Sequence, residues 1–197
     1  MKSHVKLMTE GKPVRLIVTF AFPLMIGNIF QQMYSVADSM IVGKTLGVAA
    51  LAALGASTWP NWIFLGVVMG LSQGVSITLA HSFGRGDESR LRKGFGNSIV
   101  LCAGFAVCLM AAGELLAPEM LKFLGTPEEL IPQALIYLKI SYAGIPVITA
   151  YNLLASTLRA LGDSRTPLYS MITASVINIA LDLLFVRVFR WGIGGAA

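Results

Sequence analysis

Five long apolar segments constrain the fold of this chain more than any other feature of its sequence. A helix that crosses the hydrocarbon core of a bilayer needs about 20 predominantly apolar residues. Five segments reach that length: Val14–Val42, Leu51–His81, Phe95–Ala117, Leu130–Leu158 and Pro167–Val188. The sequence therefore predicts an all-α fold, a polytopic membrane helical bundle with five transmembrane helices.

The two ends of the chain fall outside these segments. Residues 1–13 are predicted to form a cytoplasmic tail, and residues 14–190 a membrane helical lobe. The stretch 191–197 is rich in glycine and has the composition of a turn that leads into a further helix. We therefore expect the sequence to stop at the start of a sixth helix.

Composition supports the membrane class and excludes several others. The chain is 55% hydrophobic and 13% charged, whereas soluble domains carry roughly 25% charged residues. The net charge of +5 does not require a nucleic-acid partner, because most bases lie in short connections between apolar segments. Cys102 and Cys108 lack metal-ligand or redox spacing, and no glycine loop that could bind phosphate is present. We expect no enzyme, no structural metal and no cofactor.

The distribution of bases predicts the orientation in the membrane. Ten of them lie in the tail and in the second and fourth connections: Lys2, Lys6, Lys12, Arg15, Arg85, Arg90, Arg92, Lys93, Arg159 and Arg165. Four lie at the opposite ends of the segments: Lys44, Lys122, Arg187 and Arg190. Because loops rich in Lys and Arg stay in the cytoplasm, we expect a cytoplasmic N-terminus.

Asp182 is the strongest candidate for a functional residue. Asn178 precedes it by four residues, so the two side chains share one face of a helix. Carboxylate and amide oxygens suit a small cation or a proton. Asp182 lies about 22 Å along the helix from Pro167, still within the ~30 Å hydrocarbon layer. An alternative is that Asp182 pairs with Arg187 or Arg190 near the outer surface.

A second carboxylate, Asp38, lies in the first segment at a similar depth. Tyr34 and Gln31 precede it by four and seven residues, on the same stripe of the predicted helix. Either Asp38 shares a site with Asp182, or it belongs to a polar helix end near Lys44. Asn152 in the fourth segment is a further candidate for the polar network, although such an asparagine also commonly bonds to a neighbouring helix.

Six motifs, taken together, resemble the multidrug and toxic compound extrusion (MATE) transporters, and most closely the bacterial members. Their order and spacing cover nearly the whole sequence: Pro23, Gln31–Asp38, Val42–Leu51, Gly84–Asp87, Arg159–Pro167 and Asn178–Asp182. The resemblance implies one lobe of a twelve-helix antiporter in the bacterial inner membrane. Such transporters expel cationic amphipathic compounds, many of them drugs, in exchange for Na⁺ or H⁺.

The resemblance also assigns roles to individual residues. It implies a coupling-ion site built from Asp38, Asp182 and Asn178, with Gln31 nearby and Asn152 as a weaker match. It further implies a C-terminal lobe that this sequence lacks, so we expect a truncated and inactive half rather than an assembly of two copies. Membrane lipid and the missing lobe are the expected partners.

Two other functions stay open at this point. One is a flippase for lipid-linked precursors, which should line its cleft with arginines that hold pyrophosphate. The charged residues deep in the apolar segments are mainly acidic, which favours a cationic cargo instead. The other is a membrane fragment with no transport activity.

Overall fold

The computed structural model describes residues 13–197, and every regular element in that range is helical. The elements are α1 (Pro13–Leu46), α2 (Val48–Gly84), α3 (Glu88–Phe123), α4 (Ile131–Ala143), α5 (Ile145–Ala160), α6 (Arg165–Asp182), the π-helix η1 (Leu183–Val188) and the 3₁₀-helix η2 (Gly192–Gly195). Four helices are long and apolar enough to cross a membrane, and five spans result if the bent pair α4–α5 is one of them. The predicted all-α membrane bundle is confirmed, while the tail before Pro13 lies outside the described residues.

The fourth predicted segment is divided in the structure. The predicted segment Leu130–Leu158 contains Pro146, and in the structure α4 ends at Ala143 and α5 begins at Ile145, with a bend of 47° between them. Pro146 has no N–H to donate to the preceding turn, and a proline ring crowds the carbonyl four residues before it. The bend at Gly144 follows from this local chemistry.

The fifth predicted segment changes its helix type. We expected a helix over Pro167–Val188, whereas α6 begins at Arg165 and keeps α-helical geometry only as far as Asp182. The next six residues form the π-helix η1. After η1 the chain turns, and the short helix η2 lies where we expected a sixth segment to begin.

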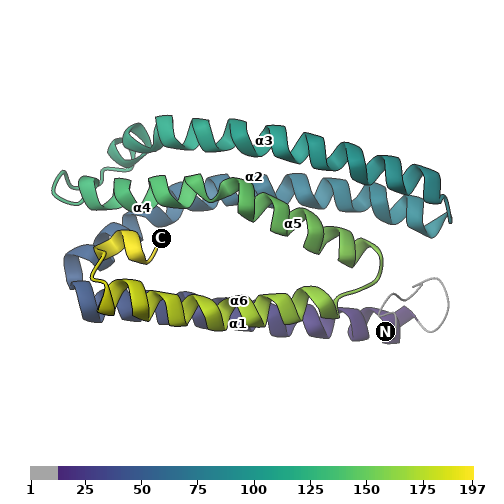
Figure 1. Ribbon diagram of the computed structural model, residues 1–197, viewed down its shortest axis with the longest axis horizontal. Helices are drawn as coiled ribbons and strands as arrows, with labels where there is room; N and C mark the ends of the chain where they lie inside the picture. Colours follow the sequence, from purple (N-terminus) through teal and green to yellow (C-terminus); the bar gives the residue numbers. More distant parts are fainter. Residues whose placement is uncertain (1–12) are drawn as a thin grey trace.

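The helices form two groups (Figure 1). The helices α2, α3, α4 and α5 pack against one another in one group, and α1 and α6 lie side by side in the other. Both α1 and α6 run toward the same end of the molecule, the left end of the view. Parallel neighbours of this kind bring their C-terminal residues to one depth, which positions the candidate site.

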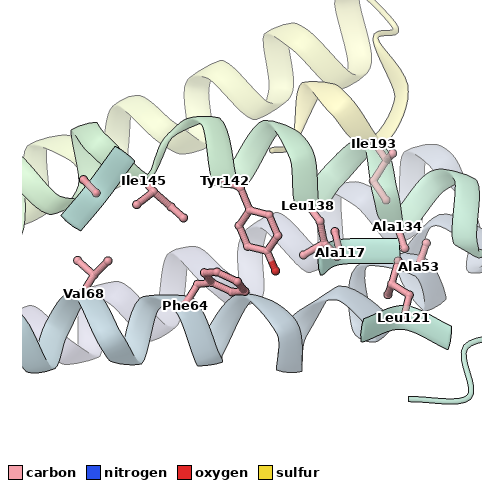
Figure 2. Close-up of a cluster of buried hydrophobic side chains, with 11 residues drawn as sticks. Ala53, Phe64, Val68, Ala117, Leu121, Ala134, Leu138, Tyr142, Ile145 and Ile193 are labelled. Carbon is pink, nitrogen blue, oxygen red and sulfur yellow. The ribbon is translucent and has the colours of Figure 1, made fainter. Parts of the chain in front are cut away.

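The main core lies between α2, α3, α4 and α5 (Figure 2). Tyr142 of α4 is fully buried and packs on Phe64 of α2, with ring centroids 4.6 Å apart. Gly113 of α3 leaves room for the Tyr142 ring, since a Cβ at this position would lie 2.8 Å from it. Close approach through glycine is a common way for membrane helices to pack.

Short connections fix the order of the helices. A single residue, Gly47, separates α1 from α2, and its φ of 87° is a conformation that glycine adopts without strain. Before α6, Asp163 accepts hydrogen bonds from the backbone N–H groups of Arg165 and Thr166, both at 3.0 Å, and from the Thr166 hydroxyl. These bonds supply partners for N–H groups that a helix start leaves unpaired.

Candidate functional site

Two carboxylates lie between the parallel helices α1 and α6. Asp38 projects from α1 and is half-buried, whereas Asp182 ends α6 and is only 4% exposed. The two side chains are close enough for their charges to interact. The structure therefore brings together the two acidic residues that the sequence singled out separately.

Three oxygen atoms at this place are buried without a hydrogen-bond partner. They are Asp38 Oδ1, Asn178 Oδ1 and Asp182 Oδ2. Buried polar atoms in folded proteins are nearly always hydrogen-bonded, so three unpaired oxygens in one region call for an explanation. Carboxylate and amide oxygens are ligands for hard cations, and a carboxylate can also take up a proton.

Pairing with an arginine does not account for the burial of Asp182. Arg187 and Arg190 are both exposed. Among residues 13–197, the ion pair found within 4 Å joins Lys122 to Glu119, at 3.6 Å. The alternative in which Asp182 forms an ion pair near the outer surface is therefore not seen in the structure.

Asp182 lies where α6 changes to the π-helix η1. The wider turn is seen in the backbone, where the Phe189 N–H donates to the Leu184 carbonyl, five residues earlier, at 2.9 Å. Segments of π-helix are rare and are frequently found at functional sites. No sequence pattern that we used distinguishes this segment from ordinary α-helix.

Two tyrosines lie near the carboxylates, Tyr34 on α1 and Tyr137 on α4. Tyr34 interacts with the Gln31 side chain and is within range of the charges of both aspartates. Tyr137 of α4, which interacts with Ser141, is also within range of both aspartates and of Tyr34. Sequence reasoning missed Tyr137. One feature of the sequence could have indicated it: Tyr137 is a phenol inside an apolar segment, and a buried Tyr O–H usually has a polar partner nearby.

Asn152 is placed differently from the other candidates. Its side-chain amide donates to the carbonyl of Ile148 in its own helix α5, at 2.9 Å. Its neighbour Tyr151 is within range of Tyr34, which extends the group of tyrosines to α5. Gln32, which lies off the stripe of Asp38, is exposed.

The fold and the buried carboxylates define a class, the multi-pass helical membrane proteins that hold ionisable residues between their spans. Such residues commonly mark pathways for ions or substrates. The model of the MatE family matches residues 23–184, and the chain belongs to this family. The family consists of transporters, which agrees with the expectation that the chain is not an enzyme.

Relatives and solved structures are similar over almost the whole chain. The probable multidrug resistance protein YpnP of Bacillus subtilis is 37% identical over 189 residues, which are 96% of this chain and 42% of the relative. The probable multidrug resistance protein YoeA of the same organism is 31% identical over 99% of this chain and 44% of the relative. The crystal structure of MATE in complex with MaD5 is 27% identical with a TM-score of 0.89, covering 100% of this chain and 44% of that one. The chain thus spans less than half the length of the proteins that it matches.

Proposed function

We propose that this chain is the ion-coupling lobe of a secondary antiporter that exports cationic amphipathic compounds in exchange for Na⁺ or H⁺. The observation that carries the proposal is the pair Asp38 and Asp182, which lie within range of each other's charge and each keep one buried oxygen without a hydrogen-bond partner. Asn178 adds a neutral oxygen on the same face of α6. These three residues would hold the coupling ion.

A second group of residues would support this site. Gln31 and Tyr34 lie along the same stripe of α1 as Asp38, and Tyr137 reaches it from α4. The phenol O–H and the amide N–H can donate hydrogen bonds to an ion-binding carboxylate without adding charge. Asn152 would belong to the more distant part of this polar network.

Ion binding would act on the two helices that carry the carboxylates. Two negative charges in a medium of low dielectric constant repel each other strongly, and a bound cation or proton removes part of that repulsion. Asp38 and Asp182 lie on the neighbouring parallel helices α1 and α6. Weaker repulsion between the two carboxylates would therefore change how closely these helices pack. An ion shifts a conformational equilibrium only if its affinity differs between the two states.

The cargo and orientation follow from charge. The carboxylates inside the membrane lobe attract cations and disfavour anions, so a cationic amphipathic compound is the expected cargo. The bases in the tail and in the connection α2–α3 support a cytoplasmic N-terminus, and we infer that the lobe lies in the inner membrane of a bacterial cell. A second lobe, present in the longer relatives, would complete the cleft.

Ion binding to the chain itself tests the first part of the proposal. The purified chain in detergent should gain thermal stability in Na⁺ or at lower pH, relative to K⁺ at neutral pH, because a ligand that binds only the folded state stabilises it. Asp182→Asn should abolish this gain. Glu114→Gln is the matched control, since Glu114 is an exposed acid of α3. An equal gain in Asp182→Asn and the control would contradict the site.

Efflux of a cationic dye tests the second part. Cells would express the chain fused to the segment of YpnP that follows the matched region, and ethidium accumulation would be measured. We expect the fusion to lower accumulation and Asp182→Asn to restore it, with Glu114→Gln behaving as the parent. Undiminished efflux by Asp182→Asn would contradict a role of Asp182 in ion coupling.

A further inference from the structure

An elongated groove lies on the face of α1 opposite the candidate ion site. Two adjoining hollows form it, one of about 540 Å³ and the other of about 500 Å³. Gln32, Val36 and Met40 line both hollows, so the two are continuous. We call this feature the α1 groove. At 100° per residue, Val36 and Met40 each point about 160° away from Asp38, so the groove is separate from the ion site.

The α1 groove has an apolar part and a polar end. Ile29, Met33, Val36 and Met40 line the mainly apolar part, and each is more than half exposed. The side chains of Asn28 and Gln32 also line this part. Toward the end of the helix, Ser35, Ser39 and finally Lys44 line the second hollow, with Leu51 of α2 as its far wall. Among the described lining residues, Lys44 is the only charged one.

The dimensions of the groove match one leaflet of a bilayer. From Ile29 to Met40 the helix rises about 16 Å, which is close to half of the ~30 Å hydrocarbon core. Lys44 lies about 6 Å beyond Met40 along the helix, at the level where a lipid headgroup would begin. A cation at that position is complementary to a phosphate, and it repels a cationic cargo.

We propose that the α1 groove binds an anionic phospholipid from the leaflet that faces the α1–α2 turn. One acyl chain lies along Ile29, Met33 and Val36, where the flexible thioether of Met33 adapts to its shape. The headgroup phosphate lies against the Lys44 ammonium. The proposal does not depend on the antiporter function.

Native mass spectrometry of the purified chain tests the proposal. The chain would be given equal amounts of phosphatidylglycerol and phosphatidylcholine with identical acyl chains. We expect it to retain phosphatidylglycerol about fivefold more, as for one partly exposed ion pair of about 1 kcal/mol. Lys44→Gln should reduce the preference to near unity while some lipid of both kinds stays bound.

Two further variants separate the headgroup contact from the groove. Val36→Trp places a large ring in the groove on an exposed face, so it should lower the retention of both lipids without harming the fold. Lys122→Gln changes another exposed lysine at the same end of the bundle and should leave the preference intact. The thermal melting of all variants shows that each is folded.

Three results would overturn the proposal. The first is an equal preference in Lys44→Gln and Lys122→Gln. The second is displacement of bound lipid by tetraphenylphosphonium with no effect of Lys44→Gln, which would make the groove a cargo surface. The third is a dimer that forms as lipid is removed and disappears in Val36→Trp, which would make the groove a contact between copies.

Discussion

Burial between membrane helices makes the charged forms of Asp38 and Asp182 costly, and this cost favours a role in binding a cation or a proton. An ionised carboxylate between membrane helices costs several kcal/mol unless it is paired or bound to a cation. The described residues offer neither carboxylate a basic partner, and three oxygens of the site keep unused acceptor capacity. A cation or proton that satisfies them would remove this cost. The oxygen atoms whose burial is costly are thus the ones that would bind the coupling ion.

Tyr137 allows this idea to be tested at a single hydroxyl group. Tyr137→Phe keeps the ring but removes the group that lies within range of both aspartates. We expect the concentration of Na⁺ or H⁺ needed for half-maximal thermal stabilisation to rise about fivefold, as for the loss of one hydrogen bond of about 1 kcal/mol. Tyr169→Phe is the control, because Tyr169 of α6 is 61% exposed. Equal ion dependence in the two variants would remove Tyr137 from the site.

The candidate residues differ in how far sequence alone could predict them. Asn178 and Asp182 are four residues apart on one helix, so helical geometry alone places them together. The nearness of Asp38 to Asp182 could be expected only from their similar depth and from the family resemblance. Tyr137 enters through the packing of α4 against the other helices, and no spacing within one segment contains that information.

At the scale of helices, close packing of α3 on α4 depends on one glycine. Tyr142 is fully buried beside Phe64, and the ring occupies the space next to Gly113. Gly113→Ala would place a Cβ 2.8 Å from Tyr142 Cδ2. We expect a loss of about 1–3 kcal/mol, typical of overpacking in a filled core. The measurement is the melting temperature in detergent.

A second glycine of the same helix provides the control for that loss. Gly104 has open space around its Cα. Gly104→Ala should leave stability unchanged or raise it by up to about 1 kcal/mol, because alanine favours helix. If Gly113→Ala melted at the temperature of Gly104→Ala, the close approach of α3 and α4 would be wrong.

The start of α6 depends on the side chain of Asp163. Asp163→Ala removes the acceptor of two backbone N–H groups and of the Thr166 hydroxyl, so we expect a loss of about 1–2 kcal/mol. Asp87 caps α3 in the same way, but its side chain accepts from one backbone N–H, that of Arg90, at 2.9 Å. Asp87→Ala should therefore cost less. Chemical unfolding of both variants in detergent measures the order, and the reverse order would contradict this account of the α6 start.

Helices were easier to predict than their irregularities. Apolar length alone indicated where the spans lie, because a bilayer demands that length. The kink near Pro146 could also be expected from the missing N–H. The change to π-helix after Asp182 could not, since the residues of η1 (Leu183–Val188) are as suitable for α-helix as those before them. Packing against other helices determines whether an α-helix changes to a π-helix, and the local sequence pattern does not contain this information.

At the scale of the whole molecule, the helices alternate in direction and the connections gather at two ends (Figure 1). The N-terminal end of α1 lies with the connections α2–α3 and α5–α6 at one end, and the connections α1–α2 and α3–α4 lie at the other. The counted bases that the structure describes, from Arg15 onward, divide between these two ends. Four of them, Arg85, Arg90, Arg92 and Lys93, belong to the region of the α2–α3 connection.

Chemical labelling of cysteines in intact cells tests this orientation. Cys102 and Cys108 would first be replaced by alanine, and then Glu88→Cys or Glu128→Cys introduced at exposed positions of the α2–α3 and α3–α4 connections. Because the basic connection should stay in the cytoplasm, a membrane-impermeant maleimide should label Glu128→Cys and leave Glu88→Cys unlabelled. After lysis, both variants should react, which controls for accessibility. Labelling of Glu88→Cys alone in intact cells would reverse the orientation and place the Asp38–Asp182 pair in the cytoplasmic half of the bilayer.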